Sequence, residues 1–452
     1  MALVDSRWQR TVTLCGLYVA QGVPWGFMLL TLPAYLSYKY KVDDTQLGDM
    51  KAWILFPWTF KLIWAPIMDS YTIRSMGRRR PWIIGAELLM ALSLLGFLGL
   101  GDLSQNLNLI ICMYVLHNCF ASLQDVSTDA LAIDILPKEE YGQMNGLMWG
   151  SKLVGRGVGA AGLSVVLNEA GIEACVAIQI VLLLAIMLIP IFILERPGEK
   201  RFPWSAGEAV EVKESKHRTL RDVLRDYLKA FSLTTMLVYV LFTLLKLIGS
   251  GINETVTSTL YTQQLNPIWT DQDFTRASGL YALLPIIMAS LIGGFLADRF
   301  GRRLMLCAGF GGYALLAMTF AANPALWNET WFSMSYLLAC AAFNALGSVA
   351  FLSMAMRISW TMAAATVFTT YMTLSNISHI AGDKLAGPVR EFLKFSDTSL
   401  AANMFSYEMT FWFVGVSSLL PLLLLFFVRP DEVDDARHAE AAEGHSGAVP
   451  QT

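Results

Sequence analysis

Four charged residues within two apolar stretches have the types and spacing that could carry a proton or hold an anion. Asp125 and Asp129 are four residues apart, as are Lys152 and Arg156, so each pair shares one face of a helix. A charge at the centre of a bilayer costs at least ~2.5–3.5 kcal/mol and therefore needs a partner or a water-filled cavity. If the two stretches form an antiparallel hairpin that turns near residues 138–141, Asp125 lies opposite Arg156 and Asp129 opposite Lys152.

Two interpretations of these four charges remain open. In the first, they form a static lattice of ion pairs that locks two helices together. In the second, they line a central cavity, and a carboxylate changes its protonation as its partners move. Buried ion pairs stabilise a protein poorly compared with apolar packing, which favours the second interpretation.

Five further residues inside apolar stretches are candidates for the same substrate or proton pathway. They are Lys61, Lys246, Glu254, Gln21 and Gln124. Lys61 could face Asp125 or extend its aliphatic stem toward the membrane interface. Lys246 and Glu254 flank two glycines, Gly249 and Gly251, which weaken a helix by ~1 kcal/mol each relative to alanine and indicate either a hinge or a close helix contact. His379 and Asp383 are weaker candidates; His379 could titrate near neutrality, but because it lies toward the outer end of its stretch we favour a surface position.

The elements that must position these residues are long apolar helices. Of the 452 residues 15% are charged, against about 25% in a soluble protein, and the mean hydropathy is +0.49. A bilayer core is ~30 Å thick and needs ~20 mainly apolar residues per helix. Runs of that length occur at 11–38, 46–69, 82–101, 106–135, 142–167, 172–194, 233–262, 277–298, 303–322, 330–356, 360–385 and 407–428. We therefore predict an all-α membrane protein with twelve transmembrane helices in two pseudo-symmetric six-helix bundles.

The distribution of lysine and arginine predicts which side each loop faces. Cytoplasmic loops carry an excess of these residues. If both termini are cytoplasmic, 22 of the 33 basic residues fall on the cytoplasmic side and six on the other side. We therefore expect a multi-pass protein with both termini in the cytoplasm.

The polar segments divide the chain into four parts. We predict an N-terminal bundle at 1–194, a cytoplasmic linker at 195–232, a C-terminal bundle at 233–428 and a disordered cytoplasmic tail at 429–452. Within the linker, apolar residues recur at helical spacing over 220–231, which indicates an amphipathic helix. That helix could lie on the membrane surface or simply pack against the bundle.

One polar loop occurs twice, once in each half of the chain. The first copy runs from Asp69 to Gly77 and three arginines, and the second from Asp298 to Gly301 and two arginines. The arginines are Arg78, Arg79, Arg80, Arg302 and Arg303. The recurrence indicates an internal duplication. Carboxylates at helix ends with nearby guanidiniums can form a network that closes the cytoplasmic side, so we predict a gate here, although the arginines could also serve only as topology anchors.

The second copy, Gly293-Gly-Phe-Leu-Ala-Asp-Arg-Phe-Gly-Arg-Arg303, resembles the signature loop of the major facilitator superfamily. The first copy departs from it, with extra residues between Asp69 and Gly77. This resemblance implies two six-helix halves that rock around a central site.

A narrower resemblance covers roughly residues 15–160. Its motifs are Gln21-Gly-Val-Pro-Trp-Gly26, Phe60-Lys-Leu-Ile-Trp-Ala-Pro66, Gly77-Arg-Arg-Arg-Pro-Trp82 and Ala121-Ser-Leu-Gln-Asp-Val-Ser-Thr-Asp-Ala130. Together they resemble the muropeptide permeases and their relatives, the acetyl-CoA transporters and certain siderophore permeases. The resemblance implies proton-coupled import of anhydro-muropeptides across a bacterial inner membrane, with siderophore or acetyl-CoA as alternative substrates.

Other function classes find no support in the sequence. No phosphate-binding loop of the Gly-x-x-x-x-Gly-Lys-Ser/Thr type is present, and no metal-ligand or nucleophile–base motif, so we expect no enzyme, no cofactor and no metal. The net charge of −3 gives no reason to expect nucleic acid. A non-transporting receptor or scaffold would need a folded domain outside the membrane, and the longest internal polar segment has about 38 residues. We expect a monomer in the bilayer that binds a small molecule and protons.

Overall fold

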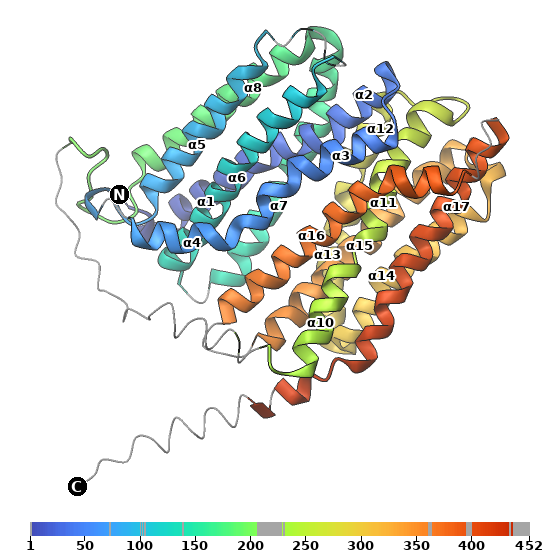
Figure 1. Cartoon of the computed structure of the whole chain (residues 1–452). Helices are drawn as coiled ribbons and strands as arrows, with labels where there is room; N and C mark the ends of the chain where they lie inside the picture. The colour runs from blue at the N-terminus through green and yellow to red at the C-terminus, as the bar shows by residue number, and fades with distance from the viewer. Residues whose placement is uncertain are drawn as a thin grey trace.

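The computed structural model shows two bundles of helices arranged side by side (Figure 1). The structure describes residues 2–71, 74–99, 101, 103, 105–137, 140–205, 228, 231–359, 364–394, 400–433 and 435–436. Within these residues the regular structure is helical apart from one isolated bridge between Ala2 and Leu194. Only helices and closed barrels satisfy every backbone group in lipid, so this architecture suits a membrane.

Six long helical segments form the N-terminal half. In chain order they are α1 (Arg7–Gly26), η2 (Phe27–Thr31) and α2 (Leu32–Tyr40); α3 (Asp44–Leu55), η3 (Phe56–Phe60) and α4 (Lys61–Ser70); α5 (Arg80–Leu94) and η5 (Leu95–Phe97); α6 (Leu107–Ile135); α7 (Tyr141–Gly157), η7 (Val158–Gly162) and the first part of α8 (Leu163–Phe192); and the rest of α8. The last two segments meet at Gly171, whose φ of 80° lies in the left-handed region that glycine tolerates. A single residue therefore replaces the loop that the sequence left between 167 and 172.

Six more segments form the C-terminal half. They are α10 (Thr234–Leu245), α11 (Ile248–Thr259) and η8 (Leu260–Gln264); α12 (Asp271–Thr275), η9 (Arg276–Tyr281) and α13 (Leu283–Phe300); α14 (Arg302–Ala321); α15 (Thr330–Ile358); α16 (Ala364–Phe392); and α17 (Leu400–Leu419) with η11 (Leu420–Phe427). Several segments are long because a short π-helical or 3₁₀ stretch joins two α-helices, as η2 joins α1 to α2 and η7 joins α7 to α8.

Length and hydropathy alone identify nine candidate membrane spans among the described residues. One of them, Gly146–Phe192, has 47 residues, which is too long for one crossing, and it turns back at Gly171. The helical segments 44–70 and 364–392 fall outside the nine, and both carry several charged residues. The predicted all-α membrane fold with two helical bundles is confirmed.

Glycines set the packing of the N-terminal half. Gly22 and Gly26 of α1 face Gly155 and Gly159 of the segment formed by α7 and η7, and a Cβ added at Gly26 or Gly159 would overlap a backbone carbonyl of the other helix. Two small residues four apart on each helix allow backbones to approach closely, as is common in membranes. Helix α1 therefore lies directly along α7, and it contacts α6 as well.

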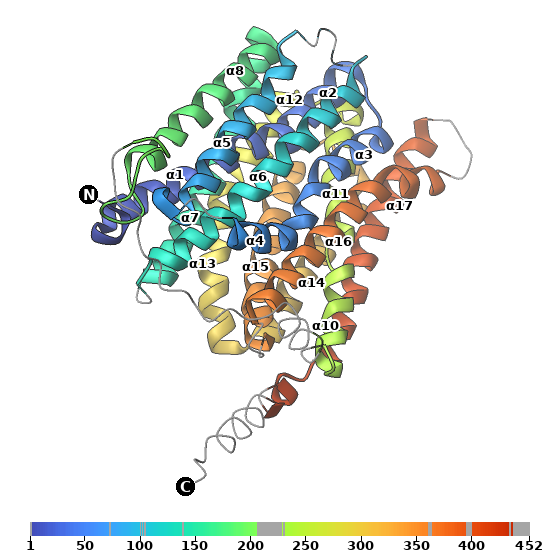
Figure 2. The ribbon, with the colours of Figure 1, turned by 60° about the vertical axis from the view of Figure 1, so that its left-hand side comes forward.

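The two halves meet most closely at one end of the molecule. This end, here named the closed end, carries the connections at residues 41–43 and 265–270; the opposite end, named the terminal end, carries the start of α1, the start of α10 and the end of η11. Figures 1 and 2 show α2, α3 and α12 gathered away from α10 and the C-terminus. At the closed end Gly48 packs on the backbone of Asp383, and Gly387 packs on Thr45.

Two predicted boundaries outside the bundles need adjustment. The first linker residues pack on the N-terminal half, because the N–H of Lys200 donates to the carbonyl of Ser75. The predicted disordered tail does not begin at 429, since residues 430–433 are helical and Thr235 donates to the Glu432 carboxylate. Apart from Leu228 and Phe231, the predicted amphipathic helix at 220–231 lies outside the described residues, as does the tail from 437 onward.

Candidate functional site

The side chain of Lys152 lies among four aromatic rings. Its ammonium nitrogen is 5.6 Å from the ring centre of Tyr18, 5.0 Å from Trp25, 4.9 Å from Trp58 and 5.5 Å from Trp149. Ring faces attract cations, most strongly in places that exclude water. Trp149 remains 45% exposed, so one side of this arrangement is open.

Two lysines hold the carboxylate of Asp125. Lys61, at the start of α4, forms an ion pair with one oxygen, and Lys152 lies 3.4 Å from the other. Lys61 also lies 4.6 Å from the ring centre of Trp58, whose indole N–H donates to Asn118. The predicted contact between Lys61 and Asp125 is therefore present in the structure. We name Lys61, Lys152, Asp125 and the four rings Tyr18, Trp25, Trp58 and Trp149 the aromatic–basic cluster.

Asp129 lies one turn further toward the terminal end. It is exposed and accepts a hydrogen bond from the Tyr18 hydroxyl at 2.5 Å. The predicted pairs, Asp125 with Arg156 and Asp129 with Lys152, are therefore wrong. Helix α7 packs along α1, so α6 and α7 do not form the assumed hairpin. Lys152 of α7 instead reaches Asp125 of α6.

The predicted glutamines form a buried polar chain behind this cluster. Gln21 donates to the Gln124 side-chain oxygen, and Gln124 donates to Glu87 at 2.9 Å. Gln21 is 3% exposed, and Gln124 and Glu87 are fully buried. These hydrogen bonds connect α1, α6 and α5 inside the N-terminal half. Both glutamine side chains are therefore buried and face no substrate in this conformation.

Arg156 leads from the N-terminal half into the C-terminal half. Its guanidinium is 3.4 Å from the carboxylate of Glu254 on α11. Lys152 and Arg156 are one turn apart on α7, so this face of α7 is directed at the other half. The aromatic–basic cluster consequently lies beside the interface between the two bundles.

A network of five charged groups crosses that interface. Glu254 also contacts His379 Nε2 at 3.1 Å, His379 Nδ1 lies 3.1 Å from Asp383, and Asp383 forms an ion pair with Lys51 of α3 at 2.8 Å. We name Arg156, Glu254, His379, Asp383 and Lys51 the cross-half network. The interpretation of His379 as a surface residue is wrong, because the ring lies between two carboxylates.

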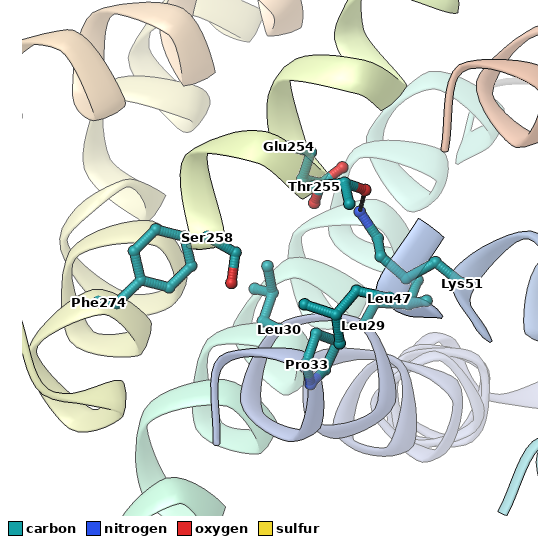
Figure 3. A pocket seen from close by; sticks show the side chains of 9 residues that line it. All are labelled: Leu29, Leu30, Pro33, Leu47, Lys51, Glu254, Thr255, Ser258 and Phe274. Atoms are coloured by element: carbon teal, nitrogen blue, oxygen red, sulfur yellow. Dashed lines mark hydrogen bonds between the residues drawn. The ribbon is translucent and has the colours of Figure 1, made fainter. Parts of the chain in front are cut away.

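A small cavity lies next to this network at the interface. Figure 3 shows Lys51 and Glu254 on one side of it, with Ser258 and Phe274 on another and the apolar residues Leu29, Leu30, Pro33 and Leu47 facing them. The cavity volume is about 10 Å³, which is room for roughly one water molecule. The Ser258 hydroxyl is buried and has no hydrogen-bond partner among the described residues.

Lys246 lies deep in the C-terminal half between α10 and α11. It donates to the Ser375 hydroxyl at 2.9 Å and sits 3.9 Å from the ring centre of Phe351. It is 3% exposed, and within the described residues no carboxylate lies within ion-pair distance of it. The structure therefore separates Lys246 from the aromatic–basic cluster.

The predicted gate arginines Arg79 and Arg80 bind groups of the N-terminal half and of the adjoining linker. Arg79 forms an ion pair with Asp134 at 2.9 Å, and its backbone N–H donates to Glu195. Arg80 is fully buried, donates to the carbonyls of Pro190 and Ile191 at the end of α8, and lies 3.3 Å from Glu199.

The arginines of the second copy behave alike. Arg302 donates to Ser353 of α15 at 2.6 Å, and Arg303 donates to the carbonyl of Val428. The side chains of Asp69 and Asp298 lie outside the described part of the structure, and Arg78 takes part in an interaction of its own. For Arg79, Arg80, Arg302 and Arg303, the partners given above lie in the same half as the arginine or, for Glu195 and Glu199, in the linker residues that pack on the first half. The gating role stays a prediction.

Carboxylate and histidine groups do not assemble as metal ligands in the described part of the chain. Two basic groups, Lys51 and Arg156, already neutralise the acids around His379. The cross-half network therefore has the charge balance of a set of hydrogen-bonded ion pairs.

The fold and the charged interface together define a class: a polytopic helical membrane protein with a polar site between two bundles. The sequence pattern of the Major Facilitator Superfamily matches residues 14–383, and the chain belongs to this superfamily of transporters. The prediction that the chain is not an enzyme is confirmed by this membership.

Curated relatives match a smaller part of the chain. The anhydromuropeptide permease of Escherichia coli K12 is 34% identical over 135 residues, which is 29% of this chain and 26% of the permease. An uncharacterized protein of Schizosaccharomyces pombe is 30% identical over 129 residues, or 27% of this chain and 24% of that protein. The matched region thus spans about a quarter of each relative.

Solved structures share the fold over nearly the whole chain. The nucleoside transporter NupG superposes with a TM-score of 0.67 at 12% identity, covering 93% of this chain and 98% of NupG. A bacterial homologue of the human lysosomal transporter Spinster, in an inward-facing and unoccupied conformation, gives 0.67 at 12% identity over 95% of this chain and 98% of that chain.

Proposed function

We propose that this chain is a secondary active transporter that imports anhydro-muropeptides by alternating access, driven by protons. The observation that carries the proposal is the aromatic–basic cluster at the interface of the two halves. Tryptophan faces stack on sugar rings, and lysines attract the carboxylates of an anionic solute. The partial similarity to the anhydromuropeptide permease supports the same substrate.

The arrangement of the halves supports an alternating-access cycle. With the terminal end taken as cytoplasmic, the closed end faces outward, and polar contacts such as Ser37 with Thr262 join the halves there. The exposed Trp149 and Asp129 are then reached from the inside. Import requires the closed end to open, load solute and close again.

Uptake into proteoliposomes tests the proposal. Labelled anhydro-muropeptide is compared with a ferric siderophore and acetyl-CoA, each with and without an imposed inward proton gradient. We expect muropeptide uptake that the gradient accelerates. Equal uptake with and without the gradient would exclude proton coupling, and preferential uptake of either other solute would replace the substrate.

A pair of tryptophan variants connects uptake to the cluster. Trp149→Ala removes a ring beside Lys152, whereas Trp331→Ala removes an exposed ring at the start of α15. Stacking of a nucleic-acid base on an aromatic side chain contributes about 1–3 kcal/mol to binding, and we take the same range for a sugar ring on Trp149. Trp149→Ala should therefore raise the apparent KM roughly 5- to 150-fold. Trp331→Ala should transport as the unaltered protein does.

A further inference from the structure

The histidine of the cross-half network has an unusual pair of partners. Both ring nitrogens of His379 lie 3.1 Å from carboxylate oxygens, one of Glu254 and one of Asp383. An ionised carboxylate only accepts hydrogen bonds, and a neutral imidazole donates from one nitrogen only. The observed geometry therefore requires one extra proton, held on the ring or on one of the two acids.

The two halves contribute different parts of this network. Glu254 and the pair His379 and Asp383 belong to α11 and α16 of the C-terminal half, which remain together when the halves separate. Lys51 and Arg156 belong to the N-terminal half and are the mobile partners. Without the extra proton, the positive charges of Lys51 and Arg156 balance the negative charges of Glu254 and Asp383. The extra proton therefore gives the network a net charge of +1.

The cations and the proton compete for the same two carboxylates. When the closed end is shut, Lys51 and Arg156 lie against Asp383 and Glu254 and repel a protonated His379. When the halves separate there, the two acids lose both cations and hold the proton more tightly. Closure therefore weakens proton binding, and by linkage proton binding must favour opening.

The surroundings give the proton a way out. The side chains of His379, Glu254 and Arg156 are 23%, 30% and 24% exposed, whereas those of Asp383 and Lys51 are sealed at 0% and 3%. Three other charged or titratable groups lie nearby. Tyr313 of α14 faces Glu254, and Lys384 forms an ion pair with Asp49. Lys246 donates a hydrogen bond to Ser375, which is one turn from His379 on α16. Within the described residues, the ring is thus reached from the interface and not through the sealed Lys51–Asp383 pair.

From this arrangement we propose that His379, clamped between Glu254 and Asp383, is the proton-binding group that couples proton movement to opening and closing of the outer side. This inference rests on the proposed proton-driven transport. It assigns the coupling proton to the C-terminal half, apart from the aromatic–basic cluster that would hold the solute. Protonation from the outside opens the closed end for loading. The shut conformation seen here still holds the proton, and its release toward the cytoplasm follows closure.

Hydrogen–deuterium exchange in lipid nanodiscs tests this assignment without any substrate. Peptides covering 32–47 and 255–265 report on the closed end, and exchange is corrected for its intrinsic pH dependence. Coupling between two sites commonly amounts to about 5–150-fold, so we expect exchange there to rise at least about fivefold from roughly pH 8 to pH 5, where histidine changes charge. His379→Gln should exchange equally at both pH values, and the matched control His438→Gln should respond as the unaltered protein does.

A second variant guards against a folding defect in the first. Glu254→Gln removes one of the two acids that require the proton and should shift the pH response to lower pH. A closed end that is indifferent to pH in the unaltered protein, or a pH response retained in His379→Gln, would overturn the assignment.

Transport assays then separate this inference from the proposed function. In proteoliposomes, His379→Gln should retain solute exchange without a gradient but lose accumulation against a solute gradient. If the unaltered protein moves no muropeptide, the proposed function fails, yet the exchange measurements still decide the role of His379. If His379→Gln accumulates solute normally, the inference fails and the proposed function stands.

Discussion

At the scale of single residues, the charge arrangement around Asp125 decides what each substitution costs. One carboxylate is shared by two ammonium groups inside the N-terminal half, those of Lys61 and Lys152, so one positive charge is left over. Removing the partner of a buried charge is more damaging than removing the whole group of charges. In the proposed function the same residues also hold the solute, so stability and transport must be measured separately.

The substitution Asp125→Asn should destabilise the protein, because it leaves two lysines close together without an anion. Breaking a buried pair costs about 3–5 kcal/mol, so a clear fall in the melting temperature in detergent is expected. The double variant Asp125→Asn with Lys152→Met removes the surplus charge and should recover most of the loss. A double variant no more stable than the single one would contradict the ion-pair account.

Glu199 supplies a residue-scale prediction outside the membrane. Burial, and then the neighbouring Glu195, raise the pKa of Glu199 to about 7, although Arg80 lies close to it. An acid whose pKa is higher in the folded than in the unfolded state binds more protons when folded. Its contribution to stability is therefore complete below its ordinary pKa and declines as the pH rises through about 7.

Melting temperatures at acidic and mildly alkaline pH check this direction. The unaltered protein should lose stability between roughly pH 5 and pH 8, and Glu199→Gln should lose less over the same interval. Glu391→Gln, an exposed acid at the end of α16, serves as the control and should follow the unaltered protein. An equal decline in Glu199→Gln would assign the pH dependence to other groups.

At the scale of elements, the contact between α1 and the α7–η7 segment determines where Lys152 and Arg156 point. The glycines at 22 and 26 and those at 155 and 159 form two small-xxx-small patterns that were visible in the sequence. Read together, they predict that the first and fifth transmembrane helices pack on each other. Reliance on chain adjacency instead led to the wrong pairing of Asp125 and Asp129.

A matched pair of glycine variants tests this contact. Gly159→Ala should destabilise the protein by at least about 1–3 kcal/mol, because its Cβ would overlap the carbonyl of Val23 and backbones cannot shift cheaply. Gly150→Ala lies on the same helical segment, where a Cβ meets nothing within 4 Å, and should be neutral or slightly stabilising. Thermal unfolding followed by size-exclusion chromatography distinguishes the two, and equal stability would argue against tight packing here.

Other elements show why prediction from the sequence reached some features and not others. Long apolar runs fixed the helices, since the bilayer imposes their length, and intramembrane charges identified Lys61, Lys152 and Arg156 as polar contact residues. The cross-half network was missed because its partners, such as Lys51 and Asp383, are far apart in the sequence. The available signal was that Lys51 is a charge inside an apolar run, which requires a partner.

At the scale of the whole molecule, the proposed function requires relative movement of the two bundles. The aromatic–basic cluster belongs to the first bundle, and the carboxylates of the cross-half network belong to the second. Solute and proton would therefore act on different bundles and communicate only through the interface. The closed end is where that communication can be interrupted.

A reversible cross-link tests this dependence. The hydroxyls of Ser37 on α2 and Thr262 on η8 lie 2.7 Å apart across the interface. Oxidation of the double variant Ser37→Cys with Thr262→Cys should hold the closed end shut and reduce uptake at least about tenfold, the loss expected when one of two required states is forbidden. Reductant should restore uptake, and each single variant should be insensitive to oxidant; uptake that persists in the cross-linked protein would contradict alternating access.

The buried guanidinium of Arg80 has a consequence for how the protein is made. Arg80 enters the membrane with the third helix, but the carbonyls that it binds at the end of α8 and the carboxylate of Glu199 are synthesised more than a hundred residues later. Until the ribosome has passed Glu199, the first bundle contains a buried cation without its carboxylate partner. Completion of the N-terminal half is thereby tied to arrival of the linker, and a nascent chain stopped at residue 194 should remain open to cellular quality control.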